Sequence, residues 1–223
     1  SFIASTFAKA REMAAQVRRH APASRIVMGG HGAMLPNLRE AVDCDDVATG
    51  LVAFVQAINE TPDASFVSAM GSRIDVDRFL THVAVENALA EADGVVGDQG
   101  LNNFYLYEYG SKNRFVFIPW DKDNTFRSGT WDLYRNLERN VLTRRLTADP
   151  AKRQVYADAV VRAATSYVNP RWLTPQLETA YQQIRSAVQA DTRKPFTNAQ
   201  FEAAVDGVRG VIAARENDVR AQR

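Results

Sequence analysis

The chain has 223 residues, a net charge of +1 at neutral pH and 24% charged residues, so it lacks the strongly basic field of a nucleic-acid-binding protein. Its hydrophobic content of 46% suits an ordinary globular core, and no apolar run is long enough to predict a membrane-spanning helix. A single cysteine, Cys44, excludes an intrachain disulfide.

The first fifty residues have the alternating pattern of part of an α/β unit. The expected elements are a helix over residues 5–20, a strand over 25–28 and a second strand over 46–48. The strings at 25–33 and 46–50 resemble the late part of the cobalamin-binding domain of radical-SAM enzymes. The Asp-x-His-x-x-Gly signature that supplies the cobalt ligand is absent. We therefore expect an incomplete α/β fragment over residues 1–50, without a cobalamin site.

From residue 51 onward the pattern is mainly helical. Asp75 or Asp77 is expected to cap a helix whose apolar residues recur at helical spacing from Phe79 to Leu89. Further helices are expected at 51–59, 63–70, 133–147, 150–168, 171–190 and 198–221. Together with one β-hairpin, described next, they predict a mainly α fold of the α+β class.

The hairpin is predicted from two aromatic-rich strands, 104–109 and 115–120, on either side of a Gly-Ser-Lys-Asn turn. The second strand delivers the carboxylates Asp121 and Asp123 at its end. Side chains mounted at the end of a buried strand are held by a rigid element, as metal and phosphate sites require.

The hairpin should also bring Asn103 close to Asp121, because an antiparallel pair places the start of one strand beside the end of the next. Asp93 precedes the first strand, in a glycine-containing loop after a helix. Carboxylate and amide oxygens suit Mg²⁺, and phosphoryl transfer needs such a metal site together with a carboxylate near the attacking hydroxyl. Asp93, Asn103 and Asp121 are therefore candidates for this chemistry.

Several strings carry a resemblance to the CotH kinase-like family of spore-coat and cell-surface proteins, which have an atypical protein-kinase fold. The matching strings are Ile-Asp-Val-Asp-Arg-Phe-Leu at 74–80, Ala-Asp-Gly at 92–94, Asn-Asn-Phe-Tyr-Leu-Tyr at 102–107 and Ile-Pro-Trp-Asp-Lys-Asp-Asn-Thr-Phe at 118–126. Later segments, 140–156 and 201–223 with Arg215, match the family's closing helices. The resemblance implies a kinase-like C-terminal lobe over residues 51–223.

By the same resemblance, Asp93 matches the catalytic aspartate that accepts a proton from the acceptor hydroxyl. Asn103 and Asp121 match metal-binding positions, and Asp123 is a candidate for a second metal or a supporting contact. The implied cofactors are ATP and Mg²⁺ or Mn²⁺, and the implied partner is a Ser-rich protein acceptor. The implied location is the cell surface, the medium or the spore coat.

Other interpretations of these residues remain open. Trp120, together with the neighbouring tyrosines, can stack on an adenine or simply pack on the sheet, and Asn102 is a second candidate at the nucleotide. A calcium loop is an alternative for the residues at positions 1, 3, 5 and 12 of an EF-hand count, which are Asp121, Asp123, Thr125 and Asp132. Against it, Phe126 stands where a glycine is required and a strand precedes the loop.

The front of the chain departs from a complete kinase. Residues 1–50 stand where a nucleotide-gripping lobe is expected, with no glycine-rich strand-loop-strand and no lysine followed by a pairing glutamate on a helix. Two functions therefore compete. One is transfer of the ATP γ-phosphoryl group to protein Ser or Thr, and the other is a non-catalytic surface or coat scaffold that binds proteins.

Overall fold

The computed structural model describes residues 25–28, 45–99, 101–109 and 114–222, with side chains from Gly50 onward. In chain order the described elements are β1 Arg25–Met28, α3 Asp45–Glu60, α4 Asp63–Gly71, α5 Val76–Ala88, β2 Phe104–Tyr109, β3 Arg114–Pro119, α6 Val141–Thr147, α7 Pro150–Ser166, α8 Pro170–Ala190 and α9 Asn198–Ala221. This is a mainly helical α+β fold, so the predicted fold class is confirmed at that level. None of the described helices is long and apolar enough to cross a membrane.

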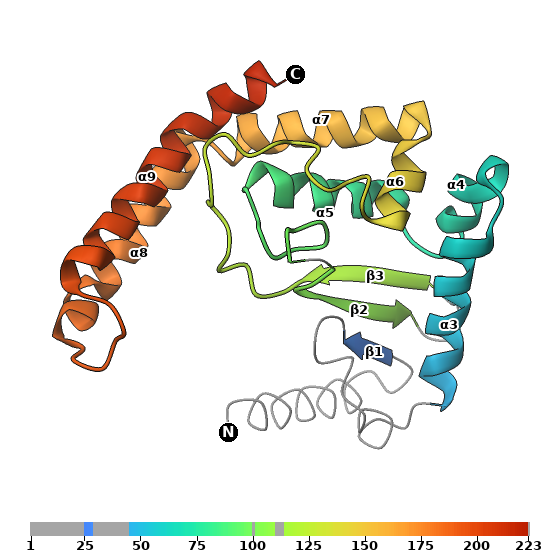
Figure 1. Cartoon of the computed structure of the whole chain (residues 1–223), viewed down its shortest axis with the longest axis horizontal. Coiled ribbons are helices and arrows are strands. Elements are labelled where there is room, and N and C mark those ends of the chain that lie inside the picture. Colours follow the sequence, from blue (N-terminus) through green and yellow to red (C-terminus); the bar gives the residue numbers. More distant parts are fainter. Residues whose placement is uncertain (1–24, 29–44, 100, 110–113, 223) are drawn as a thin grey trace.

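The sheet is antiparallel, with the strand order β1-β2-β3. In β2 and β3, Phe104 pairs with Pro119 at one end and Tyr109 with Arg114 at the other. Alternate residues of β2 are buried, and the intervening tyrosines lie on the opposite, more exposed face. Figure 1 shows α5 lying along the sheet, with α7 stacked on α5. The strand predicted at 25–28 is present as β1, and it adds to the hairpin as a third strand.

Helix α5 lies at the centre of the core and leads into the loop that bears Asp93. Asp75 caps it by accepting a hydrogen bond from the Arg78 N–H at 3.0 Å. The apolar stripe of α5 is buried, and Leu80 is completely inaccessible to solvent, which stabilises the fold by about 1.5–3 kcal/mol. On the sheet side, Phe79 packs on Phe117 with ring centroids 4.7 Å apart.

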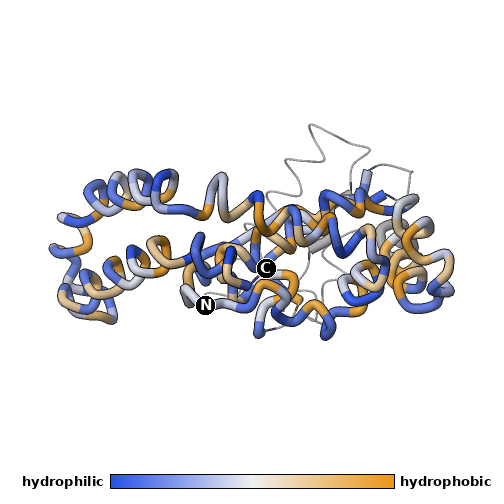
Figure 2. Tube along the Cα trace, turned by 90° about the horizontal axis from the view of Figure 1, so that it is seen from above, coloured by the Kyte–Doolittle hydropathy of each residue, from blue (hydrophilic) through white to orange (hydrophobic). Residues whose placement is uncertain are grey.

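Helices α8 and α9 form a hairpin that projects from the rest of the fold (Figure 1). Hydrophilic and hydrophobic residues alternate along both helices, as Figure 2 shows. Tyr181 stacks on Phe201 across the hairpin, and Arg209 pairs with both carboxylate oxygens of Glu178. At the root of the hairpin, Arg215 is 1% exposed and ties α9 to the core.

Arg215 acts through backbone carbonyl groups. Its guanidinium donates to the carbonyls of Asn87 at 2.7 Å and Ala88 at 2.8 Å, at the end of α5. It also donates to the carbonyl of Trp131 at 2.8 Å and pairs with Asp218 at 2.5 Å. The planar donor fork of arginine fits such a set of carbonyls, which a lysine cannot reproduce.

Two predicted elements are wrong. Residues 46–48, predicted as a strand, belong to helix α3, because a short apolar run is ambiguous between strand and helix until its flanks are known. Residues 133–140, predicted as the start of a helix, form turns, in which Asn136 has a left-handed backbone with φ of 58°. Helix α6 begins only after Asn140, whose side chain accepts from the Leu142 and Thr143 N–H groups. The predicted helix over 5–20 lies outside the described residues.

Candidate functional site

Two buried carboxylates shape the loop that follows α5 and carries Asp93. Glu86, on the last turns of α5, is 4% exposed and accepts from the Val95 N–H at 2.8 Å. Glu91 is 2% exposed and accepts from the Asp93 N–H at 2.8 Å. The loop backbone lies against Glu86, since a Cβ at Gly94 would be 2.5 Å from its Oε2. Sequence reasoning did not identify either glutamate as part of the site.

The Asp93 carboxylate is held by two side-chain amides. Asn102 donates to its Oδ1 at 2.8 Å, and Asn103 donates to its Oδ2 at 2.9 Å. The Asn102 N–H also donates to the Gly94 carbonyl at 3.3 Å, which joins the loop to the start of β2. Asp93 is 8% exposed, and each of its oxygens retains a second acceptor site. The structure thus brings together Asp93, Asn102 and Asn103.

Asn103 and Asp121 lie at the same end of the hairpin. The Trp120 N–H donates to the Asn103 carbonyl at 3.1 Å, which extends the ladder by one step beyond Phe104 and Pro119. Both residues have positive φ, 50° for Asn103 and 49° for Asp121. Left-handed backbone at non-glycine residues concentrates at functional sites, where the surrounding structure maintains it.

The Asp121 side chain is exposed, and its charge acts on Tyr105. Burial raises the pKa of the Tyr105 phenol, and the negative charge of Asp121 raises it further. Trp120 is 49% exposed and makes an edge contact with Tyr105, with ring centroids 5.0 Å apart. Trp120 therefore presents aromatic surface beside the carboxylate, while the Asn102 amide is engaged by Asp93.

The segment after β3 is hydrogen-bonded to the end of α5 and the residues that follow it. The Ala92 N–H donates to the Asn124 carbonyl at 3.1 Å, and the Phe126 N–H donates to the Leu89 carbonyl at 2.8 Å. The exposed Asp123 accepts from the Asn124 side chain at 3.1 Å. These bonds hold the carboxylate-bearing segment alongside the Asp93 loop.

Lys122 lies between the two exposed aspartates but points into the protein. Its Nζ is 2.5 Å from Glu86 Oε1, and His82 Nε2 is 3.0 Å from the same oxygen. Burial favours a higher pKa for Glu86, but the hydrogen bonds and charges of His82 and Lys122 outweigh burial and hold the pKa below its ordinary value. His82 and Glu86 are four residues apart on a predicted helix, and this spacing indicates that their side chains can meet.

Metal binding by Asn103, Asp121 and Asp123 stays a prediction. Within the described ranges, no three or more His, Cys, Asp or Glu side chains gather as a metal-binding group. The three carboxylates of the calcium-loop alternative, Asp121, Asp123 and Asp132, therefore do not form such a group. A metal shared by the Asn103 amide, Asp121 and phosphate oxygens needs no cluster of three carboxylates.

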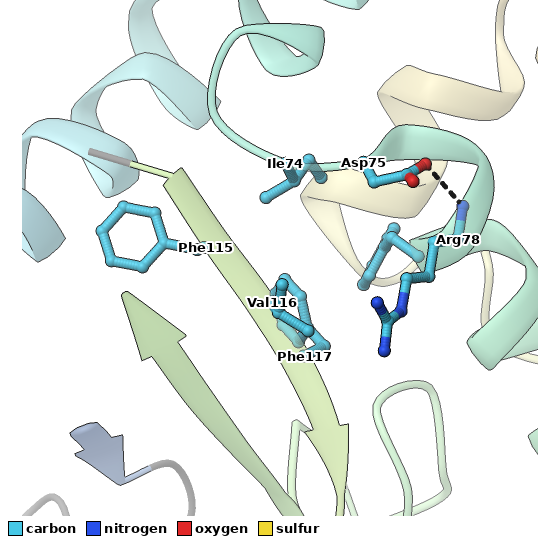
Figure 3. Close-up of a pocket in the computed structure, with 7 residues that line it drawn as sticks. Ile74, Asp75, Arg78, Phe115, Val116 and Phe117 are labelled. Atoms are coloured by element: carbon cyan, nitrogen blue, oxygen red, sulfur yellow. Dashed lines mark hydrogen bonds between the residues drawn. The ribbon is translucent and has the colours of Figure 1, made fainter. Parts of the chain in front are cut away.

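A small cavity lies elsewhere, between the start of α5 and β3 (Figure 3). Its volume is about 10 Å³, enough for one water molecule at most. The lining residues are Ile74, Asp75, Arg78, Phe79, Phe115, Val116 and Phe117. None of the candidate site residues lines it, so this cavity is not the site.

Comparison with known proteins supplies the family. The family model described as CotH kinase protein matches residues 38–219. The chain is also 28% identical, over 155 residues, to the inner spore coat protein H of Bacillus subtilis (strain 168). That match covers 67% of this chain and 41% of the relative, so the chain spans less than half of the relative's length. Because the family model covers most of the sequence, including Asp93 and both ends of the hairpin, the chain belongs to the CotH family.

Proposed function

We propose that this chain is the C-terminal lobe of a CotH-type protein kinase, which transfers the γ-phosphoryl group of ATP to serine or threonine of a protein. One observation carries the proposal, namely the Asp93 carboxylate held by the amides of Asn102 and Asn103. Asn103 also links this carboxylate to the hairpin end that bears Asp121, because its carbonyl accepts from the Trp120 N–H.

Asp93 would accept the proton of the attacking hydroxyl. Phosphoryl transfer needs little covalent help, so positioning of the acceptor and stabilisation of charge account for most of the catalysis. The hydrogen bonds from the two side-chain amides fix the rotation of the Asp93 carboxylate, and its remaining acceptor sites are available to a hydroxyl. A base that is held in this way orients the acceptor oxygen before the transfer.

Asn103, Asp121 and Asp123 would hold Mg²⁺ or Mn²⁺. An amide oxygen and carboxylates are ligands that Mg²⁺ accepts, together with phosphate oxygens and water. The Asn103 amide donates to Asp93 through nitrogen, so its oxygen remains available as a ligand. The metal would supply neutralisation of charge on the phosphate oxygens. Trp120, which is half-exposed, is the candidate surface for the nucleotide, and Asn102 is a second candidate contact.

The competing function is a non-catalytic scaffold of the spore coat or cell surface. The relative's name, inner spore coat protein H, favours a coat location and coat-protein partners. The chain spans 41% of that relative, so the whole protein's activity need not reside in this part. The projecting α8–α9 hairpin is compatible with an assembly role.

A transfer assay separates the two functions. The chain is incubated with ATP labelled at the γ-phosphate, Mg²⁺ or Mn²⁺, and a Ser-rich protein acceptor, with a chelator as the control. Metal-dependent label that is recovered as phosphoserine or phosphothreonine supports the kinase. A folded chain that binds coat proteins but transfers no label, with any of several acceptors, favours the scaffold.

A further inference from the structure

We propose that Lys122 is a positioning residue for the transfer site, because it joins the segment that bears Asp121 to the loop that bears Asp93. Both segments contact the same buried carboxylate, Glu86, through Lys122 Nζ and the Val95 N–H. The inference deepens the proposed kinase function and rests on it for its catalytic consequence. Its structural consequence can be measured without any phosphoryl transfer.

Lys122 differs from its neighbours in direction. Asp121 and Asp123 are exposed, whereas the Lys122 side chain is only 26% exposed and reaches inward to Glu86 Oε1 at 2.5 Å. The inward ion pair of Lys122 therefore anchors the segment that presents the two exposed carboxylates on either side of it. The ion pair spans 36 positions of sequence and joins helix α5 to the segment after β3.

Glu86 also contacts the loop that bears Asp93. Its Oε2 accepts from the Val95 N–H at 2.8 Å, two residues after Asp93. The backbone at Gly94 approaches so closely that a Cβ there would be 2.5 Å from the same oxygen. The loop has little room to shift while the Glu86 carboxylate stays in place, and Glu86 Oε1 is held by Lys122 and His82.

Removing Lys122 would leave a buried carboxylate with a weaker set of partners. Breaking a buried pair by deleting one member is costly because the other charge stays buried without compensation. Glu86 would then take up a proton or rotate toward solvent, and either change weakens its bond to Val95. Glu91 holds the Asp93 N–H through a separate hydrogen bond. Two buried carboxylates thus accept from the loop backbone, and only Glu86 pairs with Lys122.

This difference gives a site-specific test by amide hydrogen exchange of the whole chain, followed by NMR. In Lys122→Met, the Val95 amide should exchange about tenfold faster or more, as expected for a weakened bond to a charged acceptor, while the Asp93 amide changes much less. Lys122→Arg should restore the protection of Val95. Lys152→Met is the matched control, since Lys152 is similarly exposed, at 24%, and forms an ion pair elsewhere in the structure. Its Nζ lies 2.6 Å from Asp77 Oδ1.

Kinetics then test the catalytic consequence. Lys122→Met should lower kcat about 10–100-fold with little change in the KM for ATP, as misplacement of catalytic groups does, and Lys122→Arg should recover most of the rate. If Lys122→Met fails to fold, Lys122→Gln keeps one donor toward Glu86 and replaces it in both measurements.

The outcomes separate the inference from the proposed function. Equal acceleration at Val95 and Asp93, or none at either, overturns the role of Lys122. Selective loosening of Val95 with an unchanged kcat also overturns it as a positioning role. If the wild-type chain transfers no phosphate, the kinase proposal fails, while the exchange comparison still decides whether Lys122 fixes the loop.

Discussion

Asn103 and Asp121 stand at the same end of the β2–β3 hairpin, one just before β2 and the other two residues after β3, and both have a left-handed backbone. Their φ angles are 50° and 49°. Asn and Asp tolerate this conformation better than other non-glycine residues, for which it costs roughly 1–2 kcal/mol. Substitutions that interchange Asn and Asp therefore change the chemistry here without adding backbone strain.

The first prediction concerns metal binding. Asp121→Asn should weaken the binding of Mg²⁺ or Mn²⁺ in the presence of a nucleotide, because it removes the anionic ligand and keeps the backbone conformation. Losing an outer partner of a metal site lowers metal affinity by about 10–100-fold. We expect the loss of a direct ligand to lower the affinity at least as much. Calorimetric titration measures it, with Asp132→Asn as a control outside the site. Equal binding by wild type and Asp121→Asn would remove Asp121 from the metal site.

The second prediction concerns Asp93. Asp93→Asn should lower kcat by about 10²–10⁴-fold, because the proton acceptor is lost while the size of the side chain is kept. The KM for ATP should change little, because a base at the acceptor contributes to the transition state and not to nucleotide binding. Rates of labelled phosphate transfer at several ATP concentrations separate the two constants. Unchanged transfer by the variant would contradict the assignment.

The third prediction concerns Arg215. Arg215→Lys should lower the free energy of unfolding by about 3–5 kcal/mol, because an ammonium cannot reach the carbonyls of Asn87, Ala88 and Trp131 together and leaves Asp218 partly unpaired. Urea denaturation followed by circular dichroism measures it. Arg220→Lys is the control on the same helix, since Arg220 is 56% exposed and pairs with Glu216. Equal midpoints for the two variants would mean that the buried fork contributes little.

The fourth prediction is a pH dependence that comes from Glu91. Burial raises the pKa of Glu91 above its ordinary value of 4.5, against the opposing effects of the Asp93 N–H and Lys122. Within the described part of the chain, its Oε2 has no hydrogen-bond partner. The folded state then binds this proton more tightly than the unfolded chain, so stability falls as pH rises from about 4.5 through the folded-state pKa.

Glu91→Gln removes this titration and keeps an oxygen that can accept from the Asp93 N–H. The variant should therefore be more stable than the wild type at pH 7.5, and the difference should shrink toward pH 4. Urea midpoints at several pH values give the comparison, with the exposed Glu138→Gln as a control. A constant difference between variant and wild type at all pH values would show that Glu91 does not titrate in this way.

The fifth prediction concerns the boundary near Gly50, which stays a prediction. Among the strands that the structure describes, β1 lies at the edge of the sheet and pairs only with β2, over four residue pairs. Its amide protons should exchange earlier than those of α5, which is packed against α7 and the sheet. Hydrogen exchange followed by mass spectrometry resolves the two peptides. Equal protection of β1 and α5 would indicate that the first fifty residues share one core with the rest.

Local sequence signals, such as caps and the spacing of apolar residues, predicted several helices. Asp75 and the stripe from Phe79 onward predicted α5, and the helix predicted over 198–221 is present as α9. The structure adds that a capping box of Thr197 and Gln200 starts α9. The nearness of Asn103 and Asp121 also follows from the hairpin alone, because an antiparallel register leaves no other arrangement. These features depend on residues close together in the sequence or on one pairing.

Tertiary partners decided the parts that sequence reasoning missed. Residues 133–140 have a helical pattern, but Arg135 and Asn136 bond to Asp98 instead, and no local pattern announces that contact. Lys122 appears in the sequence as a solvated lysine between two aspartates, and its inward direction depends on Glu86, which lies on another element. Glu91 precedes Asp93 by two residues, yet its burial comes from the packing around the loop.

The close approach of Gly94 to Glu86 constrains how this loop can vary. Any side chain at position 94 would overlap the Glu86 carboxylate, whose Oε2 would lie 2.5 Å from the new Cβ. Gly94→Ala should therefore be accepted only alongside a shorter residue at position 86, and that second change would leave Lys122 without its carboxylate. In a mutational library, replacements at positions 86 and 94 should consequently appear together, and position 122 should keep a cation wherever Glu86 is kept.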